Sequence, residues 1–169
     1  MVVHVFVLGI DPGVTRCGYA IIEPRARRPR PVAIGIITTA ADLALPSRLA
    51  ELQHELRGLF DEYQPAVVAI ERVFFQHNVR TAMSVGQASG LVMAEAASRG
   101  CAVAMYSPNE VKQSVTGDGA ADKAAVAAMV QVLLGLSRPP SPADAADAAA
   151  LALCHLAHAP MAAAVEAHR

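Results

Sequence analysis

Two carboxylates stand at the ends of apolar segments, where a strand of a sheet would finish. Asp11 closes "HVFVLGID" (4–11), and Glu71 closes "AVVAIE" (66–71). In an open α/β sheet, parallel strands finish at one edge with neighbours about 4.8 Å apart, so the two side chains would meet there. Carboxylates held together repel unless they share a proton or a cation lies between them. The placement therefore indicates a metal site.

A second pair of carboxylates lies in "SPADAADAAALALCH". Asp144 and Asp147 are three residues apart, which puts them on one face of a helix, where their charges repel. Alanines between them would let this helix approach a sheet closely. Four carboxylates gathered from two strand ends and one helix offer only oxygen ligands, which suits Mg²⁺ or Mn²⁺ rather than zinc. Two such ions about 3.5–4 Å apart activate water and stabilise the leaving oxygen in phosphodiester cleavage.

Each of these carboxylates except one also has a structural explanation. Asp11 precedes a Pro-Gly pair and is a good turn former. Glu71 could be solvated or paired with a basic neighbour. Asp144 suits the third position of a helix that Ser141 would cap. Asp147, one turn further along, has no comparable role.

Composition favours a protein of one ordinary domain. The chain has 169 residues, of which 54% are hydrophobic and only 4% aromatic, so the core must be built from Ala, Val, Leu and Ile. We expect one domain over 1–169, with its core at about 4–158 and a tail at 160–169 that frays. Three scattered cysteines indicate reduced thiols, and no signal peptide or membrane-spanning stretch is expected. A cytoplasmic protein follows from these features.

Charge alone does not decide whether the chain binds nucleic acid. The formal net charge of -1 argues against a uniformly basic surface. Locally, however, basic residues are concentrated. Arg25, Arg27, Arg28 and Arg30 crowd one turn, and Arg72, Arg80, Lys112 and Lys123 lie near the carboxylate motifs. Bound metal would neutralise the carboxylates and leave the working surface positive.

Hydrophobic periodicity predicts an α/β protein with a mixed sheet. Strands are expected at 4–11, 17–23, 31–39, 66–71 and 102–107, and helices at 46–64, 79–99, 109–115, 121–134 and from near Ser141 onward. The first three strands form an antiparallel meander, whereas the strand–helix–strand connections that follow favour parallel pairing. Ser47 is the expected cap of the first helix.

The motifs taken together resemble one family. "GIDPGVTRCGYAII", "AIERVFFQHN", "GQASG", "VKQSVTGDGAADK" and "DAADAAALALCH" occur in this order. From about residue 5 to residue 156, the chain closely resembles the RuvC family of crossover-junction (Holliday junction) endodeoxyribonucleases. Each motif is weak alone, but the ordered set is specific. The resemblance implies a ribonuclease H-like fold, with a mixed five-stranded sheet flanked by helices.

The resemblance also implies a site and an activity. Asp11, Glu71, Asp144 and Asp147 match the family's metal-binding catalytic carboxylates, which hold two Mg²⁺ ions, with Mn²⁺ able to substitute. A homodimer would nick two opposing strands of a four-way DNA junction symmetrically, leaving 5′-phosphate and 3′-hydroxyl ends. The RuvA–RuvB branch-migration complex is the implied partner.

Six further residues match the family's contacts with DNA. They are Phe74, Arg80, Lys112, Gly117, Gly119 and Lys123. The aromatic ring would stack on bases, the basic side chains would hold phosphates, and the glycine amides would approach the backbone. The alternatives are one core phenylalanine of a pair, ordinary surface cations and a simple helix break. Ala120 stands where a basic residue often follows the second glycine, so one phosphate contact is in doubt.

The helix at 79–99 matches the family's dimer-forming region, and packing on its own sheet is the alternative. Three other functions compete with the resolvase interpretation. A sugar-kinase or actin-like ATPase also begins with a strand that ends in Asp-x-Gly, but it needs a second phosphate loop. YqgF-like nucleases share that opening, and a non-catalytic junction-binding scaffold would be expected to lose carboxylates. All four are present here.

Overall fold

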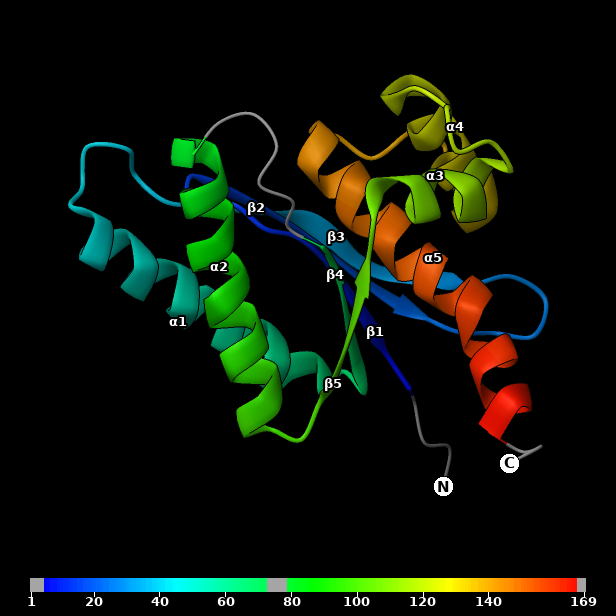
Figure 1. Cartoon of the computed structure of the whole chain (residues 1–169), viewed down its shortest axis with the longest axis horizontal. Helices are drawn as coiled ribbons and strands as arrows, with labels where there is room; N and C mark the ends of the chain where they lie inside the picture. Colours follow the sequence, from blue (N-terminus) through cyan, green and yellow to red (C-terminus); the bar gives the residue numbers. More distant parts are fainter. Residues whose placement is uncertain (1–4, 73–78, 167–169) are drawn as a thin grey trace.

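The computed structural model describes residues 5–72 and 79–166, with side chains as far as residue 159. The strands are β1 (Val7–Asp11), β2 (Arg16–Glu23), β3 (Arg30–Thr38), β4 (Val67–Glu71) and β5 (Ala102–Tyr106). The helices are α1 (Leu45–Tyr63), α2 (Val79–Ser98), α3 (Pro108–Thr116), α4 (Lys123–Leu134) and α5 (Ala143–Glu166) (Figure 1). Every element predicted from the sequence is present, with shifts at the boundaries.

The strands form one mixed sheet in the order β3-β2-β1-β4-β5. β1, β2 and β3 pair antiparallel, whereas β1 with β4 and β4 with β5 pair parallel. This confirms the predicted meander followed by parallel strands, which is the ribonuclease H-like arrangement. β1 is central, so it is buried on both faces, and this explains its continuous apolar sequence.

Helices cover both faces of the sheet (Figure 1). On one face, Leu8 of β1 packs with Leu52 of α1 and Val92 of α2. On the other face, Ala20 of β2 packs with the alanines of α5, and α3 and α4 lie against that helix. The sheet thus holds the ends of β1 and β4 between two layers.

α5 packs close to the sheet because the residues that face each other are glycines on the strands and alanines on the helix. A side chain on Gly9 of β1 would overlap the carbonyl of Ala148, and one on Gly18 of β2 would overlap the carbonyl of Asp144. The alanines on the facing side of α5 are fully buried. Two strand glycines therefore fix the height of α5, and with it the position of its carboxylates.

Two predicted helix caps are wrong, although both helices begin within about two residues of the predicted positions. α1 has Ala44 at its N-cap with no side-chain hydrogen bond, and Ser47 lies inside its first turn. A proline in the first turn of α1 needs no amide partner, so the helix begins before the predicted cap. α5 begins at Ala143, where the carbonyl of Pro142 accepts from the amide of Ala146 at 3.4 Å, so Ser141 precedes the helix instead of capping it.

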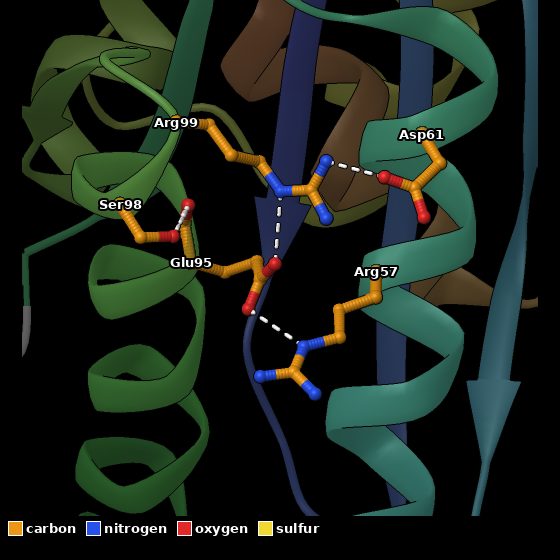
Figure 2. A network of polar contacts seen from close by, with 5 residues as sticks. All are labelled: Arg57, Asp61, Glu95, Ser98 and Arg99. Atoms are coloured by element: carbon orange, nitrogen blue, oxygen red, sulfur yellow. Dashed lines mark hydrogen bonds and ion pairs between the residues drawn. The ribbon is translucent and has the colours of Figure 1, made fainter.

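A charged network joins α1 to α2 on the face away from α5. Figure 2 shows Glu95 of α2 between two arginines: Arg57 of α1 donates to its Oε2 at 3.2 Å, and Arg99 donates to its Oε1 at 2.8 Å. Arg99 also pairs with Asp61 of α1. The Glu95 side chain is only 8% exposed, yet both of its oxygens have a cationic partner. Burial raises its pKa, but these hydrogen bonds outweigh burial and lower the pKa of Glu95.

All three cysteines, Cys17, Cys101 and Cys154, are buried and unpaired, as expected for reduced thiols. Within the described ranges, every helix is too short or too polar to cross a membrane. The interpretation as one domain with a tail at 160–169 stays a prediction.

Candidate active site

The ends of β1 and β4 bring two of the predicted carboxylates together. Ile10 pairs with Ile70 across the parallel ladder, and Asp11 and Glu71 are the next residue on each strand. The backbone of both strands is fixed by the central sheet, so the two side chains emerge side by side. The register confirms that the two strand ends are neighbours, as predicted, and the charge of Glu71 raises the pKa of Asp11.

α5 adds the other two carboxylates from above the sheet. The carbonyl of Asp144 rests on Gly18, and Gly18 is the register partner of Asp11. Asp147, one turn further along, faces both strand ends and raises the pKa of Asp11 and of Glu71. The side chains of Asp144 and Asp147 are 23% and 25% exposed, and both raise the pKa of Asp11, so the helix carboxylates lie near the strand ends.

The electrostatics of this cluster are those of a site with too much negative charge. Burial, followed by the charges of Asp147, Glu71 and Asp144, raises the pKa of Asp11 from 3.8 to about 7, although Lys123 opposes the shift. Burial and Asp147 raise the pKa of Glu71 in the same direction. A carboxylate that holds its proton near neutral pH marks a place that favours a bound cation.

Two basic side chains stand beside the helix carboxylates. Lys123 Nζ, at the start of α4, donates to Asp147 Oδ2 at 2.7 Å, and this hydrogen bond raises the pKa of Lys123. Arg16 Nε lies 3.3 Å from Asp144 Oδ2, but without the geometry of a hydrogen bond. That oxygen is fully buried and lacks a hydrogen-bond partner. It is an unsatisfied acceptor in a site whose ligands would all be oxygens.

The residues present fit a hard divalent cation. The four carboxylates supply only oxygen donors, one of which is orphaned, and their mutual repulsion would be relieved by positive charge. In the described part of the chain, no three His, Cys, Asp or Glu side chains are drawn together around a common point. Asp147 is hydrogen-bonded to Lys123, and Asp144 is ion-paired with Arg16.

A hollow of about 270 Å³ opens next to this cluster. Its lining includes Glu71 and Asp147 together with Lys112 of α3 and Lys123 of α4. Two acidic and two basic side chains thus face the same small space. This is the arrangement expected where a phosphate group is held beside metal-binding carboxylates.

Gly117 and Gly119, the two glycines predicted to contact DNA, lie in the loop after α3, and their amides already donate hydrogen bonds within the chain. Gly117 ends α3 in a left-handed conformation (φ 77°), and its amide donates to the carbonyl of Gln113. The amide of Gly119 donates to Gln113 Oε1 at 3.1 Å. These contacts agree with the helix-break alternative. Contact of either glycine with DNA stays a prediction.

The remaining residues that were predicted to contact DNA lie outside this loop. Phe74 lies outside the described residues. Arg80 is exposed at the start of α2 and lines a hollow together with Val14, which belongs to the turn after Asp11. Its contact with DNA stays a prediction. His155, which ends the last motif, has a structural partner: its Nδ1 lies 2.8 Å from the Tyr106 hydroxyl.

Sequence reasoning missed three residues that shape the site. Arg16 pairs with Asp144, while Gly9 and Gly18 admit α5 to the sheet. A signal for the glycines was available, since a glycine inside a strand often marks the close approach of another backbone. Nothing in the sequence indicated the partner of Arg16, which is 128 residues away from it along the chain (144 - 16).

The sheet order and the carboxylates at its edge define an α/β protein of the ribonuclease H-like class. Comparison with known proteins narrows this class. The sequence profile of the family "Crossover junction endodeoxyribonuclease RuvC" matches residues 7–155. The chain therefore belongs to the RuvC family, whose nucleases are generally metal-dependent. This membership also decides against the ATPase and YqgF-like alternatives.

Individual relatives agree with the profile. The chain is 52% identical to the crossover junction endodeoxyribonuclease RuvC of Streptomyces griseus over 168 residues, covering 96% of this chain and 82% of the relative. It is 54% identical to that of Streptomyces avermitilis over 155 residues, covering 91% and 88%. Thermus thermophilus RuvC, solved in complex with a Holliday junction substrate, is 34% identical with a TM-score of 0.89, covering 94% of this chain and 97% of that one.

Proposed function

We propose that this chain resolves Holliday junctions by nicking two opposing strands of a four-way DNA junction symmetrically, with Mg²⁺ as cofactor. The observation that carries the proposal is the convergence of Asp11, Glu71, Asp144 and Asp147, where the pKa of Asp11 is raised to about 7. A relative of the same fold is seen with a Holliday junction substrate. The products would have 5′-phosphate and 3′-hydroxyl ends.

The four carboxylates would hold two Mg²⁺ ions, or Mn²⁺ in their place. Bound there, the ions would activate the attacking water and stabilise the leaving oxygen. The chain's own residues orient the substrate. Lys112 and Lys123 face the hollow beside Glu71 and Asp147, where they would hold the scissile phosphate and offset its developing charge.

Lys123 has a second role in this proposal. It donates to Asp147 and lowers the pKa of both Asp11 and Glu71, so it partly balances the carboxylate cluster. Its side chain is 77% exposed and can exchange the carboxylate for a phosphate. Gly117, Gly119, Arg80 and Phe74 are proposed as further DNA contacts.

A homodimer would deliver the two symmetric nicks. α2 supports this, because it exposes apolar side chains that its own sheet does not cover. Val79 is 76% exposed and Met83 is 58% exposed. A side chain added at Gly86 or Gly90 would meet open space, so this face is also smooth. We propose that α2 forms the dimer contact, that the dimer acts in the cytoplasm, and that RuvA–RuvB is its partner complex.

The test is cleavage of a synthetic four-way junction with Mg²⁺ or with EDTA. Paired nicks on opposing strands are expected with Mg²⁺ only, and a linear duplex of the same sequence should remain intact. Glu71→Gln should abolish cleavage, whereas Glu55→Gln, a matched change on the exposed face of α1, should not. Cleavage in EDTA would refute the metal mechanism. Binding of the junction by the wild-type chain without any cleavage would favour the scaffold alternative.

A further inference from the structure

The connection between β2 and β3 carries four exposed arginines that the proposed site does not use. They are Arg25, Arg27, Arg28 and Arg30, and we call residues 24–30 the arginine hairpin. It lies at the amino end of β1, where Ile22 pairs with Val7, whereas the carboxylates lie at the other end. The hairpin is therefore a separate basic feature, and the acidic site does not neutralise it.

A buried carboxylate fixes the base of the arginine hairpin. Glu23 is only 6% exposed, and its Oε2 accepts from Arg25 at 2.8 Å and from Arg30 at 2.6 Å. These two arginines are thereby held in place. Arg27 and Arg28 lie at the exposed tip, and neither has an ion-pair partner within the ranges that the structure describes. Two fixed and two unpaired guanidinium groups leave the hairpin strongly positive.

The tip of the hairpin is held against the end of α4. The guanidinium of Arg28 lies over Gly135, and a side chain at that glycine would overlap it. Leu134 and the four arginines line a hollow of about 610 Å³ between the two elements. Cations are favoured at the carboxyl end of a helix, so α4 also stabilises the position of Arg28. The basic groups are thus presented on a supported surface.

α4 connects this hollow to the active site. Its first residue, Lys123, bonds Asp147, and its last residue, Leu134, lines the arginine hollow. Twelve residues of helix span roughly 18 Å. Between its ends α4 has no charged residue, and its exposed positions carry the small side chains of Ala124, Ala125 and Ala128 and then Val132. The exposed carboxylate of the N-cap Asp122 lies at the start of this path, beside Lys123, and the helix itself adds no acidic side chain.

We propose that the arginine hairpin binds the sugar–phosphate backbone of a duplex arm of the junction as that arm leaves the active site along α4. Phosphates are spaced 3.4 Å apart per strand along the helix axis, so a separation of roughly 18 Å places the contact about five base pairs from the scissile phosphate. Guanidinium groups suit this ligand, because their forked donors match phosphate oxygens. The inference rests on the proposed function, since it requires the junction as substrate.

The test measures junction binding without divalent ions as salt is varied. Arg27→Ala/Arg28→Ala should weaken binding about tenfold at 150 mM salt and reduce the salt slope by about one for each phosphate that the variant no longer neutralises. Arg27→Lys/Arg28→Lys is the matched control and should keep the slope. At saturating protein with Mg²⁺, the alanine variant should cut at the wild-type rate, because the carboxylates are untouched. An unchanged slope in the alanine variant would overturn the inference.

The position of the contact is tested with modified DNA. Neutral methylphosphonate linkages placed four to seven base pairs from the cleavage site (about five base pairs is expected) should weaken binding by the wild-type chain but not by the alanine variant. Equal weakening in both would overturn the inference. A wild-type chain that neither binds nor cuts the junction refutes the proposed function itself, and a wild-type chain that cuts while the hairpin variant binds normally refutes only this contact.

Discussion

Glu95 and Asp11 are both withdrawn from solvent, but their surroundings treat the two charges in opposite ways. Between α1 and α2, Glu95 receives Arg57 and Arg99, and its pKa is lowered (Figure 2). At the ends of β1 and β4, Asp11 faces three more carboxylates, and its pKa is raised to about 7. Glu95 has its counterions within the chain, so it stabilises the fold. Asp11 lacks sufficient counterions, so it is suited to recruit them from solution.

The difference teaches how to separate structural from functional carboxylates in this protein. Burial alone does not distinguish them, because it raises the pKa at both places. The neighbours decide: two arginines outweigh burial at Glu95, whereas Lys123 alone does not outweigh it at Asp11. Substitutions that remove the charge should therefore have opposite effects on stability and on cleavage at the two places.

The largest effect is expected for Asp11→Asn. Loss of a central metal ligand should lower the single-turnover rate of junction cleavage by at least about 10³-fold, since metal ions contribute several kcal/mol to the transition state and each tenfold is 1.36 kcal/mol. In EDTA the variant should be at least as stable as the wild type, because a repelling charge has gone. A fall in its melting temperature would mean that Asp11 is structural, as Glu95 is.

A smaller effect of the opposite kind is expected for Glu95→Gln. The shape is retained but Arg57 and Arg99 lose their shared anion, so the free energy of unfolding should fall by about 1–3 kcal/mol. Denaturant unfolding would measure this loss. Cleavage per folded molecule should stay near the wild-type level, with Glu55→Gln as the control for an exposed position. A loss of cleavage without a loss of stability would contradict the comparison.

The smallest effect is a difference in pH dependence, which has opposite signs at the two residues. Asp11 keeps its proton to about pH 7 when folded but releases it near 3.8 when unfolded, so its destabilising charge develops as pH rises between these values. Glu95 has a lowered pKa, so its stabilising charge is present above its ordinary value of 4.5 and is lost as pH falls.

Thermal unfolding in EDTA from pH 4 to pH 7.5 would measure both effects. The stability gained by Asp11→Asn should be near zero at the low end and reach a few degrees at the high end, at about 2–4 °C per kcal/mol for a chain of this size. The deficit of Glu95→Gln should be greatest at the high end and shrink toward the low end. If the change in melting temperature followed pH in the same way for both variants, the neighbouring charges would not act on Asp11 and Glu95 in opposite directions.

The sequence predicts the sheet and the strand-end carboxylates well, and the reason is local. An apolar run buried on both faces can only be a central strand, and the residue that closes it must lie at the edge of the sheet. Asp11 and Glu71 follow from this logic alone. The Asp144 and Asp147 pair follows from helical spacing, because the two charges repel on one face and Asp147 has no structural role there.

What the sequence does not predict depends on contacts between distant segments. Glu95 and Arg57 are 38 residues apart, and nothing near either one indicates the other. The caps predicted at Ser47 and Ser141 were wrong because a plausible capping residue is common, and the backbone around it decides whether it is used. Gly9 and Gly18 are unfavourable strand residues when the sequence is considered alone, and the close approach of the α5 backbone explains them.

The contact of Gly18 with the backbone of Asp144 has a consequence for variant libraries of this gene. Any side chain at position 18 would lift α5 and separate Asp144 from its strand-end partners, although residue 18 itself takes no part in the chemistry. A screen that scores only the absence of cleavage would group Gly9 and Gly18 with the four carboxylates. Scoring the abundance of the folded protein as well would separate the carboxylates that act as ligands from the glycines that let α5 approach the sheet.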